Sequence, residues 1–526
     1  MKPERVEILD TTLRDGAQAE GISFSVNDKY RIASLLSSIG IKYIEAGNPG
    51  SNPKDREFFS EFSDKCNIGE KSVLAAFGST RRKGTLPAQD PGIADIVAAG
   101  TDTVVIFGKV WDVEVRDILR CSQDENVEMI RDTMEYFKSL GKEVIFDAEH
   151  YFEAYMCNQE YAIRCLKAAE AGGASAVVLC DTNGATMPEV VDVCVREAVS
   201  EVGCKVGIHT HNDSGLAVAN SLVAVLAGAT HVQGTFNGIG ERCGNANLST
   251  IIPNLQLKYG IECIPADKMP MLTHVARAMA DVANITLTGQ EPYIGSSAFS
   301  HKAGMHVDGV KKNPSTFEHV EPESVGNARR FLMSEISGRS AIMDIISKYD
   351  SSIDKSSPKV AQILSKLKEM EHKGYHFEGA QASQELLVCK ELGSYKPYFS
   401  LEKMRISGEL PWLGEFSASA FIKIIVDDVS EVTASEGDGP VNAMDQALRK
   451  ALEVFYPEIN TIRLTDYKVR VLDTKATASH VRVLIESTDG DEIWSTVGVS
   501  TDILEASWIA LVDSLEYRLM RGSMAK

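Results

Sequence analysis

The chain lacks the sequence features of several protein classes. It has 54 Lys and Arg against 74 Asp and Glu, a formal net charge of −20, and no long basic run, so nucleic acid and membrane surfaces are poor candidates as partners. No apolar run reaches the ~18 residues of a membrane span, and no signal-type apolar core follows the first residues. The ten cysteines never form Cys-x-x-Cys, so neither a zinc knuckle nor a disulfide framework is indicated. We therefore expect a cytoplasmic protein whose thiols are mostly free and buried.

The length indicates more than one domain. Single hydrophobic cores rarely grow beyond ~250–300 residues, so a chain of 526 residues is expected to form two to four domains. An apolar content of 44% and a charged content of 24% are those of an ordinary globular protein.

Short apolar runs alternate with helical patterns over the first ~265 residues. Helical periodicity is clear at residues 28–38, 125–140, 160–171 and 217–226. Eight strands that alternate with helices over this length match a closed (β/α)8 barrel, the TIM barrel, and the competing arrangement is an open doubly wound sheet. The predicted strands are residues 6–10, 41–46, 72–77, 103–107, 143–147, 176–180, 205–209 and 231–236.

Polar residues follow the predicted strands where each strand ends. Any one of them could be a helix cap, because Asp and Asn are common in that role. Six such ends are harder to explain in this way, and in a barrel all of them open onto one face. Repetition therefore favours the barrel and predicts an active site at its mouth. The six polar ends are residues 14–15, 45–49, 147–150, 181–184, 209–213 and 237–242.

Four residues at these ends have the chemistry of a metal site. Arg14 and Asp15 follow the first strand, and His209 and His211 lie two apart at the end of the seventh. Residues two apart on a strand point to the same face, so both imidazoles can bind one ion. A lone His-x-His is a weak signal that also occurs on surface strands. Joined to Asp15 and Arg14, it predicts a divalent-metal site for an anionic, oxygen-rich substrate.

The pattern changes after about residue 280. Residues 285–345 are rich in Gly, Ser, His and Asn, and residues 355–375 have the periodicity of one amphipathic helix. We therefore predict a catalytic barrel over residues 1–270, a linker with helical subdomains over 271–385, and an α+β regulatory domain over 386–526. In this last part, two strand-then-helix units indicate weak internal symmetry. Its predicted strands are residues 416–426, 461–472 and 479–486, and its predicted helices are residues 441–454 and 505–519.

Five motifs carry a resemblance that extends over nearly the whole chain. Residues 9–18 (LDTTLRDGAQ), 209–213 (HTHND) and 238–245 (GIGERCGN) resemble the barrel motifs of the α-isopropylmalate synthase/homocitrate synthase family. Residues 304–309 (GMHVDG) and 437–441 (GDGPV) resemble its members with an amino-acid-sensing domain. Within the family, residues 21–25 (GISFS) and 146–150 (FDAEH) look most like the citramalate-forming members, which condense acetyl-CoA with pyruvate.

The resemblance implies a metal-dependent acyltransferase on a TIM barrel. It adds Asn245 as a fourth ligand to Asp15, His209 and His211, for Mn²⁺, Mg²⁺, Zn²⁺ or Co²⁺. Arg14 is expected to hydrogen-bond the ketone oxygen of the 2-oxo acid as charge develops there. Thr182 is a candidate for the substrate carboxylate, or simply a cap for the next helix.

Removal of a proton from the acetyl methyl group needs a base. Glu149, at the end of the fifth strand, and His306, in the linker, are the candidates, with an ion pair and an exposed loop histidine as the alternatives. The family's dimers bring a linker histidine to the partner's barrel, so a homodimer is implied, and His306 could act within one chain or across the dimer. Related synthases often have a tyrosine where this chain has Phe317, which we leave out of the catalytic set. Cys243 is interpreted as a small packed residue.

Several alternatives stay open at this stage. The 2-oxo acid could be that of an isopropylmalate or homocitrate synthase, and a lyase or a catalytically inactive amino-acid-sensing barrel is also conceivable. The tail is expected to bind a branched-chain amino acid, with isoleucine as the first candidate, through the loop at 437–441. This loop opens a helix and offers N–H groups to a carboxylate. The tail could instead only dimerise.

Overall fold

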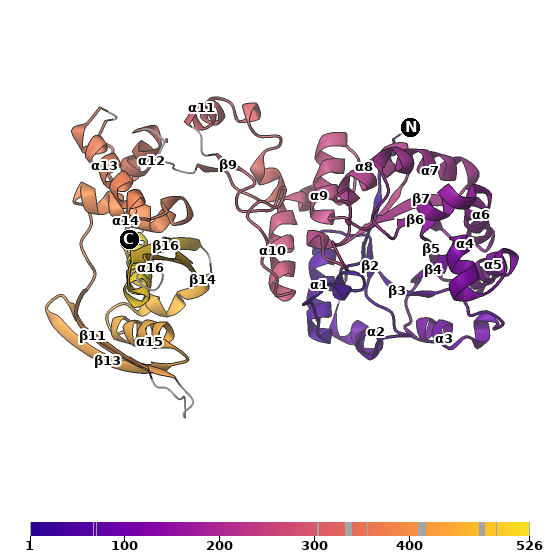
Figure 1. Ribbon diagram of the computed structural model, residues 1–526, viewed down its shortest axis with the longest axis horizontal. Helices are drawn as coiled ribbons and strands as arrows, with labels where there is room; N and C mark the ends of the chain where they lie inside the picture. The colour runs from indigo at the N-terminus through magenta and orange to yellow at the C-terminus, as the bar shows by residue number, and fades with distance from the viewer. Residues whose placement is uncertain are drawn as a thin grey trace. The chain divides into compact units, whose positions relative to one another are not determined.

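A computed structural model describes residues 2–66, 68–69, 71–301, 304–331, 339–354, 356–408, 417–472, 479–490 and 492–524. The chain divides into two compact units, which are described separately. The first consists of residues 1–300 and 314–330, and the second of residues 301–313 and 331–526 (Figure 1). Among the described residues, no helix is long and apolar enough to cross a membrane.

The first unit is built on a closed barrel of eight parallel strands, as predicted. Consecutive strands pair along the chain, and β1 pairs with β8 to close the barrel, which rules out the open sheet. The strands are β1 (Glu7–Asp10), β2 (Tyr43–Glu45), β3 (Val73–Ser79), β4 (Thr103–Lys109), β5 (Glu143–Glu149), β6 (Ala176–Asp181), β7 (Lys205–Thr210) and β8 (His231–Gly234).

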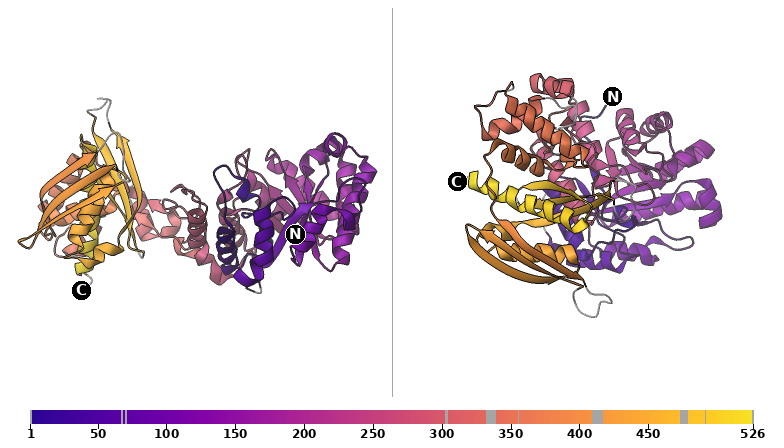
Figure 2. Two further views of the ribbon diagram at one scale, coloured as in Figure 1. Left: turned by 90° about the horizontal axis from the view of Figure 1, so that it is seen from below. Right: turned by 60° about the vertical axis from the view of Figure 1, so that its left-hand side comes forward.

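Helices surround this barrel (Figures 1 and 2). They are α1 (Val26–Ser38), α2 (Pro53–Lys65), α3 (Pro91–Ala98), α4 (Asp112–Glu114), α5 (Gln123–Ser139), α6 (Tyr151–Ala171), α7 (Pro188–Glu201) and α8 (Ala217–Ala227), followed by α9 (Leu248–Pro253) and α10 (Leu272–Val282). The predicted helix at 160–171 is the second half of α6, which begins nine residues earlier and breaks at Asn158, where φ is −152° and ψ is 78°.

Alternation of side chains along the strands creates two layers of core. Leu9, Val105 and Ile145 point into the barrel and form an inner cluster with inward residues of the other strands. Their neighbours, such as Ile8 and Val104, belong to the large outer cluster between strands and helices. Apolar residues on both faces explain why the strands read as continuous apolar runs.

The second unit combines helices with two small sheets. Its helices are α11 (Gly304–Lys312), α12 (Arg339–Tyr349), α13 (Pro358–His372), α14 (Gln381–Leu392), α15 (Pro440–Leu452) and α16 (Ile503–Met524). Its sheets are β11 (Ser400–Gly408), β12 (Ala418–Val426) and β13 (Val429–Gly437), and β14 (Arg463–Val471), β15 (Val481–Thr488) and β16 (Ile493–Ser500). Each antiparallel sheet is followed by one helix, so the tail is a repeated βββα unit (Figure 2).

This repeat confirms the α+β class and corrects its details. Strands β11, β13 and β16 were not predicted, because β11 and β13 are largely exposed and carry many polar residues. Asp427 and Asp428, which join β12 to β13, both have positive φ, as a tight hairpin turn requires. Phe416, at the start of one predicted strand, and Lys355, at the start of one predicted helix, lie outside the described residues.

Candidate active site

The carboxyl ends of the barrel strands surround a cavity of about 340 Å³. Six of the predicted site residues line it together, although they come from four strand ends that are far apart in the sequence. These residues are Arg14, Asp15, Glu149, Thr182, His209 and His211. The other lining residues are Gln18, Asn48, Phe77, Phe107, Asp147, Cys180, Glu241 and Arg242.

Three of these side chains converge on one point. Asp15 Oδ2 lies 3.3 Å from His209 Nε2 and 3.8 Å from His211 Nε2, and the two Nε2 atoms are 3.4 Å apart. All three residues are buried. Donor atoms this close together can share one divalent ion at about 2.0–2.2 Å each, so the predicted cluster has the geometry of a metal site.

A glycine-rich loop brings Asn245 beside this cluster. Asn245 forms an isolated β-bridge with His211, and its backbone N–H donates to Gly238 O at 3.0 Å. A Cβ atom on Gly240 would lie 2.1 Å from Asn245 Nδ2, so the close approach requires glycine there. The Asn245 Oδ1 atom is buried without a hydrogen-bond partner among the described residues. A buried amide oxygen in need of a partner, next to a carboxylate and two imidazoles, fits a divalent cation.

Gln233 on β8 holds His209 in place from behind. Its Oε1 lies 3.0 Å from His209 Nδ1, and its Nε2 donates to Asp147 Oδ1 at 2.8 Å. The bond to Gln233 takes Nδ1 and turns Nε2 toward Asp15, so Nε2 is the atom that would bind a metal when it carries no proton. Gln233 was not predicted from the sequence. The available signal was an amide side chain inside a fully buried strand.

Electrostatics distinguish the ionised groups from the neutral ones. Burial alone would raise the pKa of Asp15, but Arg14 and His209 hold it well below its usual value. Burial lowers the pKa of His211 to about 4, with the neighbouring His209 adding to the effect, so this ring is neutral at pH 7. Burial, assisted by the nearby Glu45, raises the pKa of Asp147 to about 7. The ligand cluster thus offers an ionised carboxylate and a neutral imidazole.

Arg14 is held between two carboxylates and a ring. Its Nε donates to Glu45 Oε2 at 2.7 Å, its Nη1 lies 3.3 Å from Asp15 Oδ2, and its guanidinium lies 3.9 Å from the centre of the Phe77 ring. Burial would lower the pKa of Arg14, but Glu45 and Asp15 raise it further above its already high value. Glu45, the last residue of β2, is a site residue that the sequence analysis placed only among the polar strand ends. A guanidinium has five N–H groups, so donors remain for a substrate oxygen.

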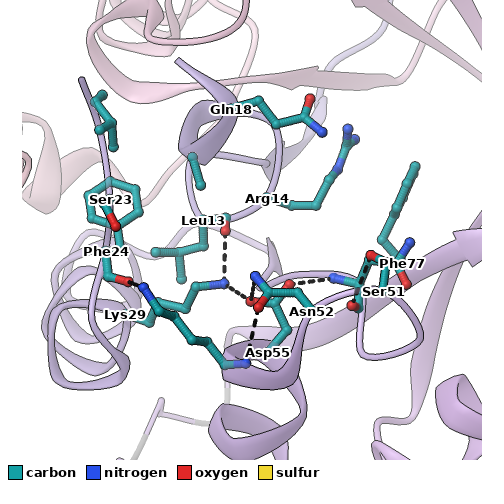
Figure 3. Close-up of a pocket in the computed structure, with 14 residues that line it drawn as sticks. Leu13, Arg14, Gln18, Ser23, Phe24, Lys29, Ser51, Asn52, Asp55 and Phe77 are labelled. Carbon is teal, nitrogen blue, oxygen red and sulfur yellow. Dashed lines mark hydrogen bonds and ion pairs between the residues drawn. The ribbon is translucent and has the colours of Figure 1, made fainter. Parts of the chain in front are cut away.

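A second cavity, of about 240 Å³, shares Arg14 with the first (Figure 3). Beneath it, Lys29 of α1 donates to Leu13 O at 3.0 Å and to Ala46 O at 2.8 Å, and it pairs with Asp55 of α2. Figure 3 shows the contacts of Lys29 with Leu13 and Asp55 below the turn that carries Arg14. Burial lowers the pKa of Lys29, while Asp55 opposes this shift. One buried ammonium therefore ties the ends of β1 and β2 to two helices and fixes the Arg14–Asp15 turn.

Glu149 and Thr182 lie on neighbouring strand ends. Glu149 Oε2 accepts from Lys109 Nζ at 2.8 Å. The Thr182 hydroxyl oxygen accepts from the backbone N–H of His150 at 2.9 Å, which leaves the hydroxyl proton for another acceptor. His150 has φ 57°, and this bond helps to hold that unusual backbone conformation. Thr182 therefore supports the backbone next to Glu149 as well as facing the cavity.

His306 belongs to the second unit, so the structure does not test its predicted role in the cavity. It lies exposed on α11 in the second unit, whose position relative to the barrel is not defined, and Phe317 is also exposed. The interpretation of Cys243 as a packed residue is wrong, because its side chain is exposed on the glycine-rich loop. The preceding residue, Arg242, has φ 57° and pairs with Asp213, and this turn leaves Cys243 outside the packed loop.

Comparison with known proteins agrees with this geometry. The HMGL-like family matches residues 5–277, which span the barrel, α9 and the first half of α10. Regions described as homocitrate synthase post-HMGL domain-like and as LeuA allosteric (dimerisation) domain match residues 293–375 and 378–519. The chain therefore belongs to the HMGL-like family.

Relatives that are similar over the full length narrow this assignment. The chain is 49% identical over 526 residues to the (R)-citramalate synthase of Aquifex aeolicus and 50% identical over 520 residues to that of Geobacter sulfurreducens, with 98% of each chain covered in both cases. Within the family, the chain thus groups with the (R)-citramalate synthases, which confirms the resemblance inferred from the motifs. A solved HMG-CoA lyase from Bacillus subtilis is 21% identical, with a TM-score of 0.47, over 54% of this chain and 96% of that one.

Proposed function

We propose that the protein is an acyltransferase that joins acetyl-CoA to pyruvate and releases citramalate and CoA, in the biosynthesis of isoleucine. One observation carries the proposal: in a chain that is 49% identical to an (R)-citramalate synthase, Asp15, His209 and His211 converge beside Arg14 in one cavity. A barrel that had become a sensor without activity would not need to keep this set of donor atoms together.

Residues at the mouth suit a small 2-oxo acid. Phe77 and Phe107 stack with their ring centres 5.3 Å apart, and both line the cavity. Their bulk favours an oxo acid with a methyl group, as in pyruvate, over one with a branched side chain.

Each cavity residue then has a defined task. A divalent ion held by Asp15, His209, His211 and Asn245 would supply Lewis-acid chemistry to the oxo acid; Mn²⁺, Mg²⁺, Zn²⁺ and Co²⁺ all suit these ligands. Arg14 donates to the ketone oxygen as it gains negative charge, and its contacts with Glu45 and Phe77 hold it ready. Thr182 donates a hydrogen bond from its hydroxyl group to the substrate carboxylate.

Glu149 removes the proton from the acetyl methyl group. It lines the cavity with a carboxylate that is three-quarters buried, and Lys109 binds one of its oxygens. His306 is the second candidate for proton transfer, and in a homodimer it would serve the barrel of either chain. These assignments predict that Glu149→Gln abolishes turnover but leaves metal content unchanged.

The tail is proposed to regulate the barrel. We keep the division at residues 270 and 385, with residues 386–526 as a domain that binds isoleucine and contributes to a homodimer in the cytoplasm. Support comes from the match of residues 378–519 to an allosteric (dimerisation) domain and from the βββα repeat. Millimolar isoleucine should inhibit the full-length enzyme several-fold, and indifference to isoleucine, leucine and valine alike would contradict this part.

A direct assay tests the reaction itself. Release of CoA from acetyl-CoA is measured with pyruvate, 2-oxobutyrate, 2-oxoisovalerate and 2-oxoglutarate in turn, with each of the four metals. Pyruvate should give the highest kcat/KM. Faster turnover of 2-oxoisovalerate would overturn the substrate assignment, and absence of turnover with every metal and oxo acid would overturn the assignment as an enzyme.

A further inference from the structure

Lys109 forms a charged cluster directly beside Glu149. Lys109 is the last residue of β4 and pairs in register with Glu149, the last residue of β5 (Figure 1). Its Nζ lies 2.8 Å from Glu149 Oε2 and 2.6 Å from Glu114 Oε1, which comes from α4. One ammonium group thus bridges two carboxylates, and only one of these carboxylates lines the cavity.

The cluster is poorly exposed to solvent. The exposed fractions of the Lys109, Glu114 and Glu149 side chains are 16%, 9% and 25%. Glu114 Oε2 is buried without a hydrogen-bond partner among the described residues. Interactions between charges are stronger in such a setting than at a surface, because water screens them less. Burial would lower the pKa of Lys109, but its bonds to Glu114 and Glu149 raise it, so the amine is charged.

The same cluster resembles a second metal site, since Glu114, Glu149 and His150 bring three donor atoms within 4.8 Å of one another. Lys109 already places a positive charge between the two carboxylates, at hydrogen-bond distance from both. An additional cation there would face strong repulsion from this ammonium group. The ammonium group of Lys109 therefore takes the place that a metal ion would occupy between the two carboxylates.

We propose that Lys109 is a positioning residue that keeps Glu149 ionised and turned toward the reacting methyl group, and that Glu114 moderates this effect by binding the same ammonium group. The inference rests on the proposed function, in which Glu149 is the base. Lys109 binds Oε2 and leaves Oε1 to accept the substrate proton. Glu114 shares the charge of Lys109, so Lys109 binds Glu149 less strongly than it would in an isolated pair.

Other charged groups around Glu149 do not replace Lys109. His150 follows Glu149 in the chain; its Nδ1 lies 3.8 Å from Glu153 Oε2, and its Nε2 lies 3.9 Å from Glu114 Oε1. Asp147 on the same strand and Cys180 on β6 also line the cavity, but Asp147 has a pKa of about 7 and burial keeps the Cys180 thiol neutral by raising its pKa. Arg14, across the cavity, is engaged by Glu45 and Asp15.

Two substitutions with opposite expected effects test the proposal. The full-length protein, loaded with Mn²⁺, is assayed for CoA release from acetyl-CoA and pyruvate between pH 5 and 9. Lys109→Met should lower kcat at least about tenfold with little change in the KM for pyruvate, and it should move the acid limb of kcat/KM up by about one pH unit or more, because removal of a close positive charge raises the pKa of a carboxylate. Glu114→Gln should move the same limb to lower pH, because it removes a negative charge that opposes ionisation of Glu149.

Lys109→Arg, which keeps the charge, should restore the wild-type profile in large part. A structural role alone would lower activity at every pH without moving the limb, and it would not give shifts of opposite sign. Unshifted limbs in folded Lys109→Met and Glu114→Gln proteins would overturn the inference. If Lys109→Met does not fold, the acid limb of Glu114→Gln alone tests the inference: a shift to lower pH supports it, and an unshifted limb overturns it. Absence of turnover by the wild-type protein would instead overturn the proposed function, and this inference with it.

Discussion

Polar groups lie at both ends of the barrel, but their hydrogen-bonding requirements are met differently. At the amino ends of the strands, Glu143 accepts hydrogen bonds from Tyr43 at 3.0 Å, Thr103 at 3.1 Å and Ser175 at 3.3 Å, and Glu7 pairs with Lys205 at 2.6 Å. At the carboxyl ends, buried atoms remain without partners among the described residues. They include Glu45 Oε1, His211 Nδ1 and Asn245 Oδ1.

This difference shows which buried polar groups serve stability and which serve binding. A buried group without a partner costs about 1–3 kcal/mol, so a fold keeps several of them in one place only if something else satisfies them. At the mouth they surround a cavity, where a metal ion and a substrate can bind. At the other end the carboxylates are already paired. Substitutions at the mouth should therefore reduce activity more than stability, and those at the other end the reverse.

The largest effect is expected from His211→Ala. It removes one of the ligands whose donor atoms lie within 4 Å of each other, so metal content and turnover should fall together, with kcat/KM reduced by about 10³-fold or more. Elemental analysis measures the metal content, and CoA release measures the turnover. The matched control is His274→Ala, an exposed histidine on α10, which should change neither quantity. A His211→Ala protein that retains full metal content would contradict the ligand assignment.

Arg14→Ala should have the next largest effect. The metal ligands remain, but the donor aimed at the ketone oxygen is lost, so kcat should fall by about 10²–10³-fold while metal content is unchanged. Arg14→Lys should restore little, because an ammonium group cannot reproduce a guanidinium that contacts Glu45, Asp15 and the Phe77 ring together. Near-normal turnover of the Arg14→Ala protein would show that its assigned role is wrong.

At the opposite end of the barrel, Glu143→Ala should affect stability and not chemistry. It leaves the hydroxyl groups of Tyr43 and Thr103 without their shared acceptor, at a cost of about 1–3 kcal/mol, whereas the Ser175 hydroxyl keeps its bond to Val144 O at 3.0 Å. The melting temperature should fall while kcat and metal content stay within about twofold of the wild-type values. A Glu143→Ala protein with a normal melting temperature and a reduced kcat would contradict the conclusion that the amino end serves stability and the mouth serves activity.

The sequence predicted the residues that line the mouth of the barrel better than the residues that hold them in place. Asp15, His209 and His211 were identifiable because each belongs to a local pattern at the end of an apolar run. Gln233 and Glu45 act through partners on other strands, and the pairing of β7 with β8 and of β1 with β2, which brings them together, exists only in the closed barrel. In both cases the sequence shows a polar residue in a buried strand. The neighbouring residues in the sequence do not indicate which side chain on another strand it contacts.

The same limit applies to the tail and to the long connection before it. Strand β12 alternates buried and exposed residues and was predicted, whereas its neighbours β11 and β13 are held mainly by backbone pairing to β12. Their side chains carry little periodic signal, because most of them face solvent. A role for His306 depends on where α11 lies relative to a barrel, and no pattern within one chain specifies that.

The smallest predicted effect concerns His231, which is the exception at the amino end of the barrel. Both of its ring nitrogens are buried without a hydrogen-bond partner among the described residues, and the ring packs against Tyr43 at 5.7 Å. Burial, with a smaller effect of Lys205, lowers the pKa of His231 to about 3, so the folded protein keeps this ring neutral. The unfolded chain has an ordinary histidine that takes up a proton near pH 6.5.

Protonation therefore favours the unfolded state as the pH falls from about 6.5 toward 3, by about 1.4 kcal/mol for each pH unit. His231→Leu removes this dependence, and leucine fills a similar volume in an apolar layer. Relative to the variant, the wild-type barrel should lose about 1 kcal/mol of stability between pH 6.5 and 5.5, because the unfolded histidine is already half protonated at pH 6.5. This corresponds to about 2–4 °C in melting temperature, and almost no loss is expected between pH 8 and 7.5. Because the other titrating groups are common to both proteins, their contributions cancel in the difference. A gap between the two proteins that is the same at pH 7.5 and at pH 5.5 would show that His231 is not held neutral by the fold.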